Sequence, residues 1–255
     1  MKVIVLIKQV PDTWNERTLD LATGAIDRLG TVVIDEINER AIEVALAYQD
    51  AHDAEVVVLT MGPKSATDML RGALAMGADS AIHVLDEALA GSDMARTARV
   101  LVAALKATGF DLVVAGNEST DGRGGVIPAM VAEGLGIAHA THLNSVVIGV
   151  DSLSGERGTE GGTMSVRASL PAVISVTELA PAGRFATFRN TMKAKKKPIL
   201  VWSAGDAGVY DRVGTGRSVV LATERSPARE AGVKVIDDGT AGEALVDFLA
   251  ARRLI

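Results

Sequence analysis

The residue types best suited to bind a ligand form one continuous stretch of glycines, hydroxyl groups, acids and one arginine. It consists of Gly116, Asn117, Glu118, Ser119, Thr120, Asp121, Gly122, Arg123, Gly124, Gly125, Val126 and Ile127. Glycines let a backbone approach a ligand closely. Pro128 marks the first turn of a helix, whose free N–H groups and positive dipole end suit an anion. The stretch predicts a loop for a nucleotide phosphate, and an ordinary turn between strand and helix is the alternative.

The elements that must position this loop are a buried strand before it and a helix after it. Short apolar runs predict strands over residues 3–7, 55–60, 81–85 and 111–115. Helical periodicity begins after each of the predicted caps Asp35 and Ser65. It also extends over residues 92–108 and from the end of the loop to about residue 135. This alternation predicts an α/β fold with a mainly parallel, doubly wound sheet of the adenine-nucleotide-binding type.

In a parallel sheet, ligands bind at the carboxyl ends of the strands. Those ends are predicted at residues 7–10, 60–63 and 116–125, so three separate stretches converge on one crevice. The polar residues 15–34 between the first strand and the first helix show no clear pattern. Pro11 is expected to end the pairing of the first strand.

The pattern changes beyond residue 142. Residues 143–150 and 163–170 alternate like antiparallel strands, with a turn at 151–155 and a buried run at 173–177, and are expected to extend the sheet. We predict a nucleotide-binding domain over residues 1–182. The sparse apolar runs of residues 183–255 predict a recognition loop and an extended C-terminal arm that packs on a partner subunit.

Composition narrows the class of protein. The 255 residues are 48% hydrophobic but only 3% aromatic, which fits an aliphatic core between strands and helices. A net charge of −6 argues against nucleic acid as the main partner. The absence of cysteine excludes disulfides and thiolate chemistry. No segment is long and apolar enough for a signal peptide or membrane insertion, so a cytoplasmic protein is expected.

Established catalytic motifs are missing. The chain has neither a P-loop nor a complete dinucleotide-binding glycine pattern, and Gly214-Thr215-Gly216 precedes no clear helix. His139 and His142 lack a third metal ligand nearby, and no serine lies in a Gly-x-Ser-x-Gly elbow. We therefore predict no metal site and no catalytic residue.

A basic run at residues 193–197 follows two of the chain's four phenylalanines, Phe185 and Phe188. Such a run is usually a solvated face. Charges beside exposed aromatic anchors also build docking surfaces, because charge steers the encounter while the apolar group holds the partner.

Several stretches together resemble the beta subunit of electron transfer flavoprotein. The longest runs from Gly155 through Arg157, Gly161-Gly162 and Arg167 to Pro171 and Ser175, with Met164 where the family usually has Glu or Gln. Residues 73–79, 184–197 and 231–235 are also similar to the family, so the resemblance spans nearly the whole chain.

The resemblance implies a heterodimer with an electron transfer flavoprotein alpha subunit, which holds most of an FAD. The flavin would accept electrons from acyl-CoA and related flavin-dependent dehydrogenases, as in fatty acid oxidation. It would pass them to a quinone oxidoreductase and the membrane quinone pool. The beta subunit would bury a structural AMP and would act as an electron carrier rather than an enzyme.

The matching AMP positions join the strand ends to the glycine-rich loop. They are Leu6, Asp35, Glu36, Ile37, Asn38, Met61 and residues 116–127. The matching dehydrogenase-docking positions are Thr187, Phe188, Arg189, Asn190, Met192 and Lys193. Phe188 stands where the family commonly has Leu. Val10, Thr13 and Trp14 leave the first strand at the crevice rim and are predicted as the FAD-facing edge.

Two alternatives remain open. Electron-bifurcating members of the family place a second FAD where others hold AMP. Asp121-Gly122 recurs in that class, but Arg123-Gly124-Gly125-Val126 departs from its usual run. The fold is also compatible with a stand-alone adenine-nucleotide-binding protein of the universal-stress type or a nucleotide-hydrolysing enzyme, although neither needs a long arm with little core.

Overall fold

The computed structural model describes residues 1–209, 218, 220–224, 227–228, 231–232 and 234–255. These residues divide into two compact units, Met1–Ala222 and Thr223–Ile255. The predicted turn Gly214-Thr215-Gly216 lies outside the described residues, as do Val219 and Val233 of two short apolar runs.

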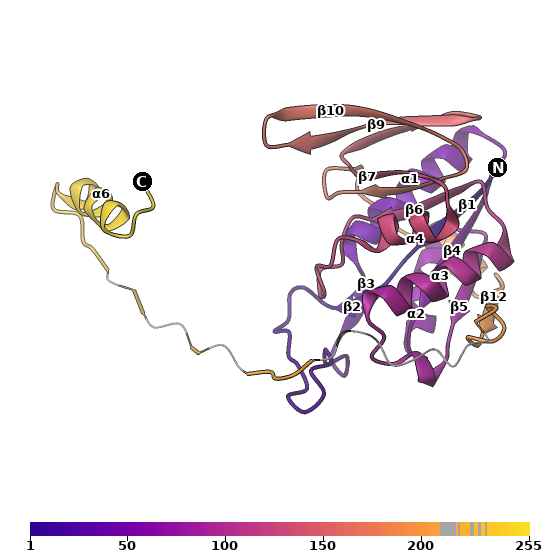
Figure 1. Cartoon of the computed structure of the whole chain (residues 1–255), viewed down its shortest axis with the longest axis horizontal. Coiled ribbons are helices and arrows are strands. Elements are labelled where there is room, and N and C mark those ends of the chain that lie inside the picture. Colours follow the sequence, from indigo (N-terminus) through magenta and orange to yellow (C-terminus); the bar gives the residue numbers. More distant parts are fainter. Residues whose placement is uncertain (210–217, 219, 225–226, 229–230, 233) are drawn as a thin grey trace. The chain divides into compact units, whose positions relative to one another are not determined.

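The first unit is built on a seven-stranded sheet whose strands are all parallel (Figure 1). In spatial order the strands are β12 (Ile199–Trp202), β5 (Ser80–Val84), β4 (Glu55–Met61), β1 (Lys2–Leu6), β6 (Leu112–Gly116), β11 (Ala172–Val176) and β7 (Ala138–Leu143). This arrangement confirms the predicted mainly parallel α/β fold. β1, β4, β6 and β11 are almost wholly buried, as expected for strands that are covered on both faces.

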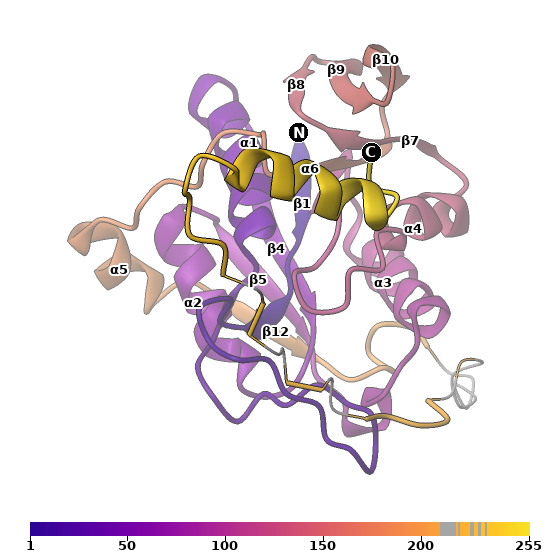
Figure 2. The ribbon, with the colours of Figure 1, turned by 90° about the vertical axis from the view of Figure 1, so that its left-hand side faces the viewer.

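Helices cover both faces of the sheet. The helices α1 (Glu36–Ala51) and α2 (Ala66–Met76) lie on one side, and α3 (Met94–Thr108) and α4 (Ile127–Leu135) lie on the other, as Figure 2 shows. The side chains of β1 alternate accordingly: Val3 and Val5 belong to the apolar core under α1 and α2, and Ile4 and Leu6 to the core under α3 and α4. A short 3₁₀ turn, η1 (Glu87–Leu89), precedes α3.

Local signals explain most helix ends. Asp35 caps α1, as predicted, because its side chain accepts a hydrogen bond from the Ile37 N–H. Gly77 and Gly109 end α2 and α3 with positive φ angles of 154° and 69°. Ser65 is the N-cap residue of α2, as predicted, but its side chain makes no capping hydrogen bond. Its hydroxyl donates to Gln9 Oε1 instead.

The predicted antiparallel extension of the sheet is correct only in part. The buried run at 173–177 extends the central sheet as β11, but in parallel, and the antiparallel strands form two separate small sheets. β2 (Gln9–Pro11) pairs with β3 (Val32–Ile34), and Pro11 lies opposite Val32 as the last residue of its strand. β8 (Ser145–Ile148), β9 (Ser152–Thr159) and β10 (Gly162–Ser169) form the other sheet. The turn expected at residues 151–155 is therefore mostly strand, since both neighbours of β9 supply hydrogen-bond partners.

The segment after residue 182 contains two further elements of the first unit. The helix α5 (Phe188–Ala194) is followed by β12, which pairs with β5 at the sheet edge. The boundary at residue 182 and the packing of residues 183–255 on a partner stay predictions, although β12 belongs to the chain's own sheet. The second unit contains α6 (Ala241–Ala251), which has no buried residue.

Candidate functional site

The predicted nucleotide loop follows β6 at the point where the strand order reverses. From β1 the chain runs outward through β4 to β5, and then crosses to β6 on the other side of β1. Such a switch point opens a crevice at the carboxyl ends of the two central strands. Leu6, at the end of β1, lies opposite Ala115 near the end of β6. Met61 is the last residue of β4, at the same carboxyl edge of the sheet as Leu6, and is half-buried.

Asp35 connects the start of α1 to this loop. Its Oδ1 accepts from the Ile37 N–H at 3.0 Å. Its Oδ2 accepts from the N–H and the hydroxyl of Thr120 at 2.7 Å and 2.9 Å. Asp35 is completely buried, and these three bonds are its compensation for the loss of water. The sequence signal for a helix cap therefore marked a residue that also fixes the loop.

Asn38 gives a second connection, one helical turn further along α1. Its Oδ1 accepts from the Lys8 backbone N–H at 2.7 Å, directly after β1. A Cβ at Gly116 would stand 2.6 Å from Asn38 Nδ2 and 3.1 Å from Ile37 Cγ2. A side chain at Gly116 would therefore require Asn38 to shift, and Asn38 is held by its bond to the Lys8 N–H.

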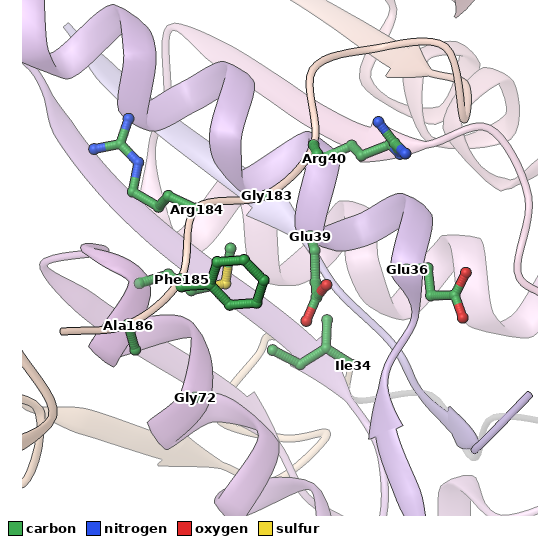
Figure 3. Close-up of a pocket in the computed structure, with 11 residues that line it drawn as sticks. Ile34, Glu36, Glu39, Arg40, Gly72, Gly183, Arg184, Phe185 and Ala186 are labelled. Atoms are coloured by element: carbon green, nitrogen blue, oxygen red, sulfur yellow. The ribbon is translucent and has the colours of Figure 1, made fainter. Parts of the chain in front are cut away.

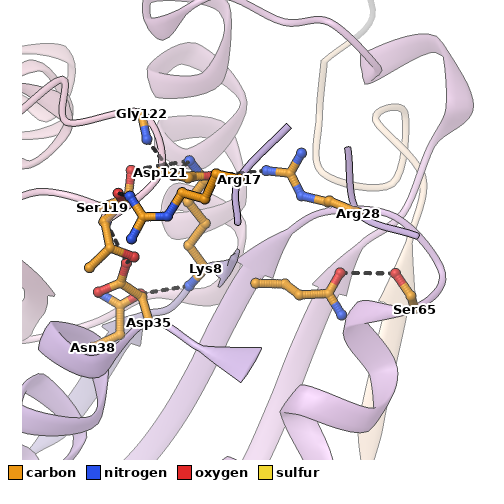
Figure 4. Close-up of polar contacts among 11 residues, drawn as sticks. Lys8, Arg17, Arg28, Asp35, Asn38, Ser65, Ser119, Asp121 and Gly122 are labelled. Carbon is orange, nitrogen blue, oxygen red and sulfur yellow. Dashed lines mark hydrogen bonds and ion pairs between the residues drawn. The ribbon is translucent and has the colours of Figure 1, made fainter. Parts of the chain in front are cut away.

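Asp121 lies at the centre of a cluster of basic side chains, shown in Figure 4. Its carboxylate pairs with Lys8 Nζ at 2.6 Å and with Arg28 Nη2 at 3.0 Å, and its side chain is only 2% exposed. Burial acts to raise the pKa of Asp121. The hydrogen bond and charge of Lys8, with further bonds from Ser119 and Gly122, outweigh it and lower the pKa below its usual value.

Three cations in this cluster were absent from the predicted site: Lys8, Arg17 and Arg28. Lys8 Nζ also donates to Ser119 Oγ at 3.1 Å, and the Arg17 guanidinium donates to the Thr120 carbonyl. Lys8 directly follows a predicted strand, and this position at a carboxyl end could have identified it as a member of the site. The two arginines lie in the polar segment 15–34, whose sequence has no periodicity to place them. Together they bring three positive charges to the loop, and the carboxylate of Asp121 pairs with two of these groups.

The end of the loop leads into α4, which begins without a side-chain cap and with a proline in its first turn. Arg123 and Gly125 have positive φ angles of 46° and 64°. A Cβ at Gly124 would stand 2.7 Å from Met94 Sδ. Uncapped helix N–H groups, close glycines and nearby cations make a site for an anion.

A buried polar atom at the base of the loop has no partner among the described residues. Asn117 is 9% exposed, and its Oδ1 makes no hydrogen bond there, although its backbone N–H donates to the Val176 carbonyl at 2.8 Å. An unsatisfied acceptor at this depth is costly unless a ligand or water donates to it. The loop thus offers a polar contact as well as an anion site. Its other predicted members, Glu118, Gly122, Val126 and Ile127, are partly or fully exposed.

The predicted docking residues lie on and before α5. Thr187 caps this helix by accepting from the Asn190 N–H at 3.2 Å, and the side chains of Phe188 and Met192 are 84% and 49% exposed. Arg189 and Lys193 are exposed as well. The basic run is not uniformly solvated, because Lys197 is partly buried and donates to the carbonyls of residues 74, 77 and 78.

Only part of the predicted FAD-facing edge reaches the protein surface. Val10 is completely buried in β2, so its side chain is withdrawn from any partner. Thr13 donates to Glu36 Oε1 at 2.7 Å, and the Trp14 side chain is 92% exposed. Thr13 and Trp14 therefore remain as the surface part of this edge.

Two kinds of feature are absent from the described part of the chain. Those residues contain no group of three or more His, Asp or Glu placed to hold a metal ion. They also contain no helix with the length and apolar character that crossing a bilayer requires.

Comparison with known proteins adds to this geometry. Residues 23–207 match the electron transfer flavoprotein domain. The chain is 46% identical to the electron transfer flavoprotein subunit beta of Mycobacterium tuberculosis (strain ATCC 25618 / H37Rv) and 44% identical to that of Mycobacterium leprae (strain TN), with 99% of each chain covered. The chain belongs to the electron transfer flavoprotein beta subunit family.

Membership of this family makes the chain an electron-carrier subunit in flavin-linked electron transfer, with an alpha subunit as its partner. The chain is also 36% identical to Protein FixA of Azorhizobium caulinodans, over 83% of this chain and 78% of that one. The similarity to beta subunits spans the loop, α5 and the second unit alike, since the alignment covers nearly the whole chain.

Proposed function

We propose that the chain forms a heterodimer with an alpha subunit that holds most of an FAD. The heterodimer carries electrons from acyl-CoA and related dehydrogenases to a quinone oxidoreductase, in fatty acid oxidation in the cytoplasm. The observation that carries this proposal is the match to mycobacterial beta subunits over 99% of both chains. The mainly exposed residues of α5 support a docking role for it, and Trp14 and Thr13 form the edge that faces the flavin.

We further propose that the loop at Gly116–Ile127 holds an AMP without redox chemistry. The basic cluster at Asp121, the uncapped start of α4 and the unpartnered Asn117 Oδ1 all fit a nucleotide with a phosphate. Residues 35–38, Leu6 and Met61 complete the site. A bound AMP would stabilise the folded state by mass action, because the unfolded chain does not bind it.

Co-expression with the alpha subunit tests the first proposal. The expected product is a yellow heterodimer whose flavin is reduced by an acyl-CoA dehydrogenase with its substrate. A colourless monomer that never captures a flavin-bearing partner contradicts the proposal.

Denaturing the purified complex and identifying the released nucleotides tests the second proposal. AMP and FAD in equal amounts are expected. Two FAD per heterodimer with no AMP would indicate the bifurcating alternative. ATP that is hydrolysed by the chain would indicate a stand-alone nucleotide-binding protein or enzyme.

A further inference from the structure

A second hollow lies apart from the nucleotide loop. It is a cavity of about 440 Å³ between α1, α2 and the segment at residues 182–186 that leads into α5. Ile34, Gly72 and Met76 give it apolar walls, and Glu36 and Glu39 of α1 bring two carboxylates to it. An apolar cavity with a few polar groups is a general property of binding sites.

Glu39 is the unusual member of this wall. It is half-buried, and among the described residues its carboxylate has no ion pair or hydrogen bond. Burial, together with the negative charges of Glu36 and Asp35, raises the pKa of Glu39. Glu36 differs, because it is exposed and accepts a hydrogen bond from Thr13. A half-buried carboxylate without a cation is costly unless another molecule supplies one.

The two arginines of the cavity wall do not pair with the Glu39 carboxylate. Arg40 donates to the Ala180 carbonyl, and Arg184 pairs with Glu43 at 2.8 Å and with Asp50 at 2.9 Å. Figure 3 shows both guanidinium groups directed away from Glu39, and Phe185 lines the same cavity as Glu39. The cavity wall therefore combines a carboxylate that has no cation among the described residues with an aromatic side chain.

The rim of the cavity is continuous with the proposed docking surface. Phe185 is 97% exposed and stands three residues before Phe188. Three residues of chain span at most about 11 Å, so a protein that covers Phe188 also reaches Phe185. A solvent-exposed phenylalanine beside an acidic cavity is better suited to a partner than to the core of this subunit.

We propose that this cavity receives an arginine side chain of the dehydrogenase that docks on α5, with its guanidinium between the Glu39 carboxylate and the Phe185 ring. The identity of the partner rests on the proposed function. Arginine fits better than lysine, because its planar group forms two parallel bonds to a carboxylate and stacks on an aromatic face. The contact adds charge selectivity to the apolar hold of Phe188.

A binding experiment tests the cavity directly on the full-length chain in its heterodimer. N-acetyl-arginine methylamide is titrated against the ¹⁵N-labelled beta subunit, with the neutral N-acetyl-citrulline methylamide as the matched probe. Saturable NMR shifts at Glu39 and at residues 183–186 are expected with arginine only. Glu39→Gln should abolish them, and Glu133→Gln, an exposed carboxylate on α4, should preserve them. Equal shifts with citrulline or in Glu39→Gln, or no saturable shift, would overturn the proposal.

A kinetic experiment tests the partner. With a wild-type heterodimer that an acyl-CoA dehydrogenase reduces, Glu39→Gln and Phe185→Ala should each raise the KM for the heterodimer about three- to tenfold and leave kcat unchanged. Glu133→Gln should alter neither value. An unchanged KM in both variants overturns the inference alone. A wild-type complex that binds the arginine probe but is never reduced contradicts the proposed function and leaves the cavity's chemistry in place.

Discussion

Lys8 and Asp121 form a 2.6 Å ion pair that joins the end of β1 to the loop after β6. The pair lies at the switch point of the sheet, where the chain leaves β1 and β6 toward helices on opposite faces (Figure 2). Lys8 is half-exposed and Asp121 is almost completely buried, so the lysine reaches inward to compensate a carboxylate that lacks water. The shape of the nucleotide loop depends on this contact.

Replacing Asp121 by Asn should destabilise the protein. The substitution leaves Lys8 and Arg28 without their counter-charge in a partly buried setting, which should cost about 1–3 kcal/mol in the free energy of unfolding. Urea unfolding measures this cost, and the AMP content of the purified complex should also fall. Glu55→Gln is the control, with a loss within about 0.5 kcal/mol, because it breaks a 3.8 Å pair at a 51% exposed side chain and leaves Lys2 bonded to the Thr108 carbonyl. Equal losses in the two variants would contradict a special role for Asp121.

The lowered pKa of Asp121 also predicts a pH dependence. Its ionised form is favoured in the folded state, so the pair stabilises the protein fully above the unfolded carboxyl pKa of about 3.9. That contribution is lost as the pH falls through the lower, folded-state pKa. The difference in unfolding free energy between wild type and Asp121→Asn should therefore be constant near neutral pH and shrink below about pH 4. A difference that persists unchanged at pH 3 contradicts this assignment.

Gly116→Ala tests the close approach of α1 to β6. The added Cβ would meet Asn38 Nδ2 at 2.6 Å, so the loop or α1 must move, at a cost of about 1–3 kcal/mol. AMP should also be lost on gel filtration, because Asn38 and the loop shift together. Gly161→Ala is the control, since nothing lies within 4 Å of its Cβ position and its φ is not positive. Thermal unfolding measures the stability of both variants, and nucleotide analysis measures the AMP that each retains.

Much of this site could be predicted from the sequence, because its parts depend on local signals. The resemblance to the family implies Leu6, Asp35 and Met61 as site positions. Independently, short apolar runs predict strand ends at residues 7–10, 60–63 and 116–125, and the helical pattern after Asp35 predicts it as a helix cap. The convergence of these residues then results from a general property of parallel sheets.

Other parts depend on contacts that no local pattern encodes. Arg17 and Arg28 come from a polar segment without periodicity, and only tertiary structure brings them to residues 120 and 121. Ser152–Thr159 has turn-forming residues at its start, yet pairing on both sides makes it a strand. Ile199–Trp202 is too short a run to indicate that it completes the sheet beside β5.

Phe188→Ala should impair docking without affecting the fold. The side chain is 84% exposed, so its removal should change the free energy of unfolding by less than about 0.5 kcal/mol. Loss of an aromatic anchor typically costs 1–2 kcal/mol of binding, which corresponds to a KM for the dehydrogenase reaction about five- to thirtyfold higher. Flavin content should remain normal. Val150→Ala, an 86% exposed residue beside β8, is the control. Unchanged reduction kinetics in Phe188→Ala would refute the anchor role.

Lys197→Met tests how α5 is held in place. Lys197 Nζ donates to the carbonyls of Leu74, Gly77 and Ala78 at the end of α2, and Arg71 of α2 donates in return to the carbonyls of Ala194 and Lys197 at 2.7 Å each. The C-terminal end of α2 thus receives a cation from the turn after α5, and the C-terminal end of α5 receives one from α2, which favours both helix dipoles.

Burial lowers the pKa of Lys197, but the three carbonyls give its ammonium group the acceptors that it needs. Methionine keeps the length of the side chain and loses all three bonds, at an expected cost of about 1–3 kcal/mol. Amide hydrogen exchange should accelerate at the end of α2 and in α5, and the KM for the dehydrogenase should rise because Phe188 is no longer held in one orientation. Lys196→Met, at an exposed neighbour outside this contact, should leave both measurements unchanged. If the two variants behave alike, the basic run acts through its charge rather than through the position of α5.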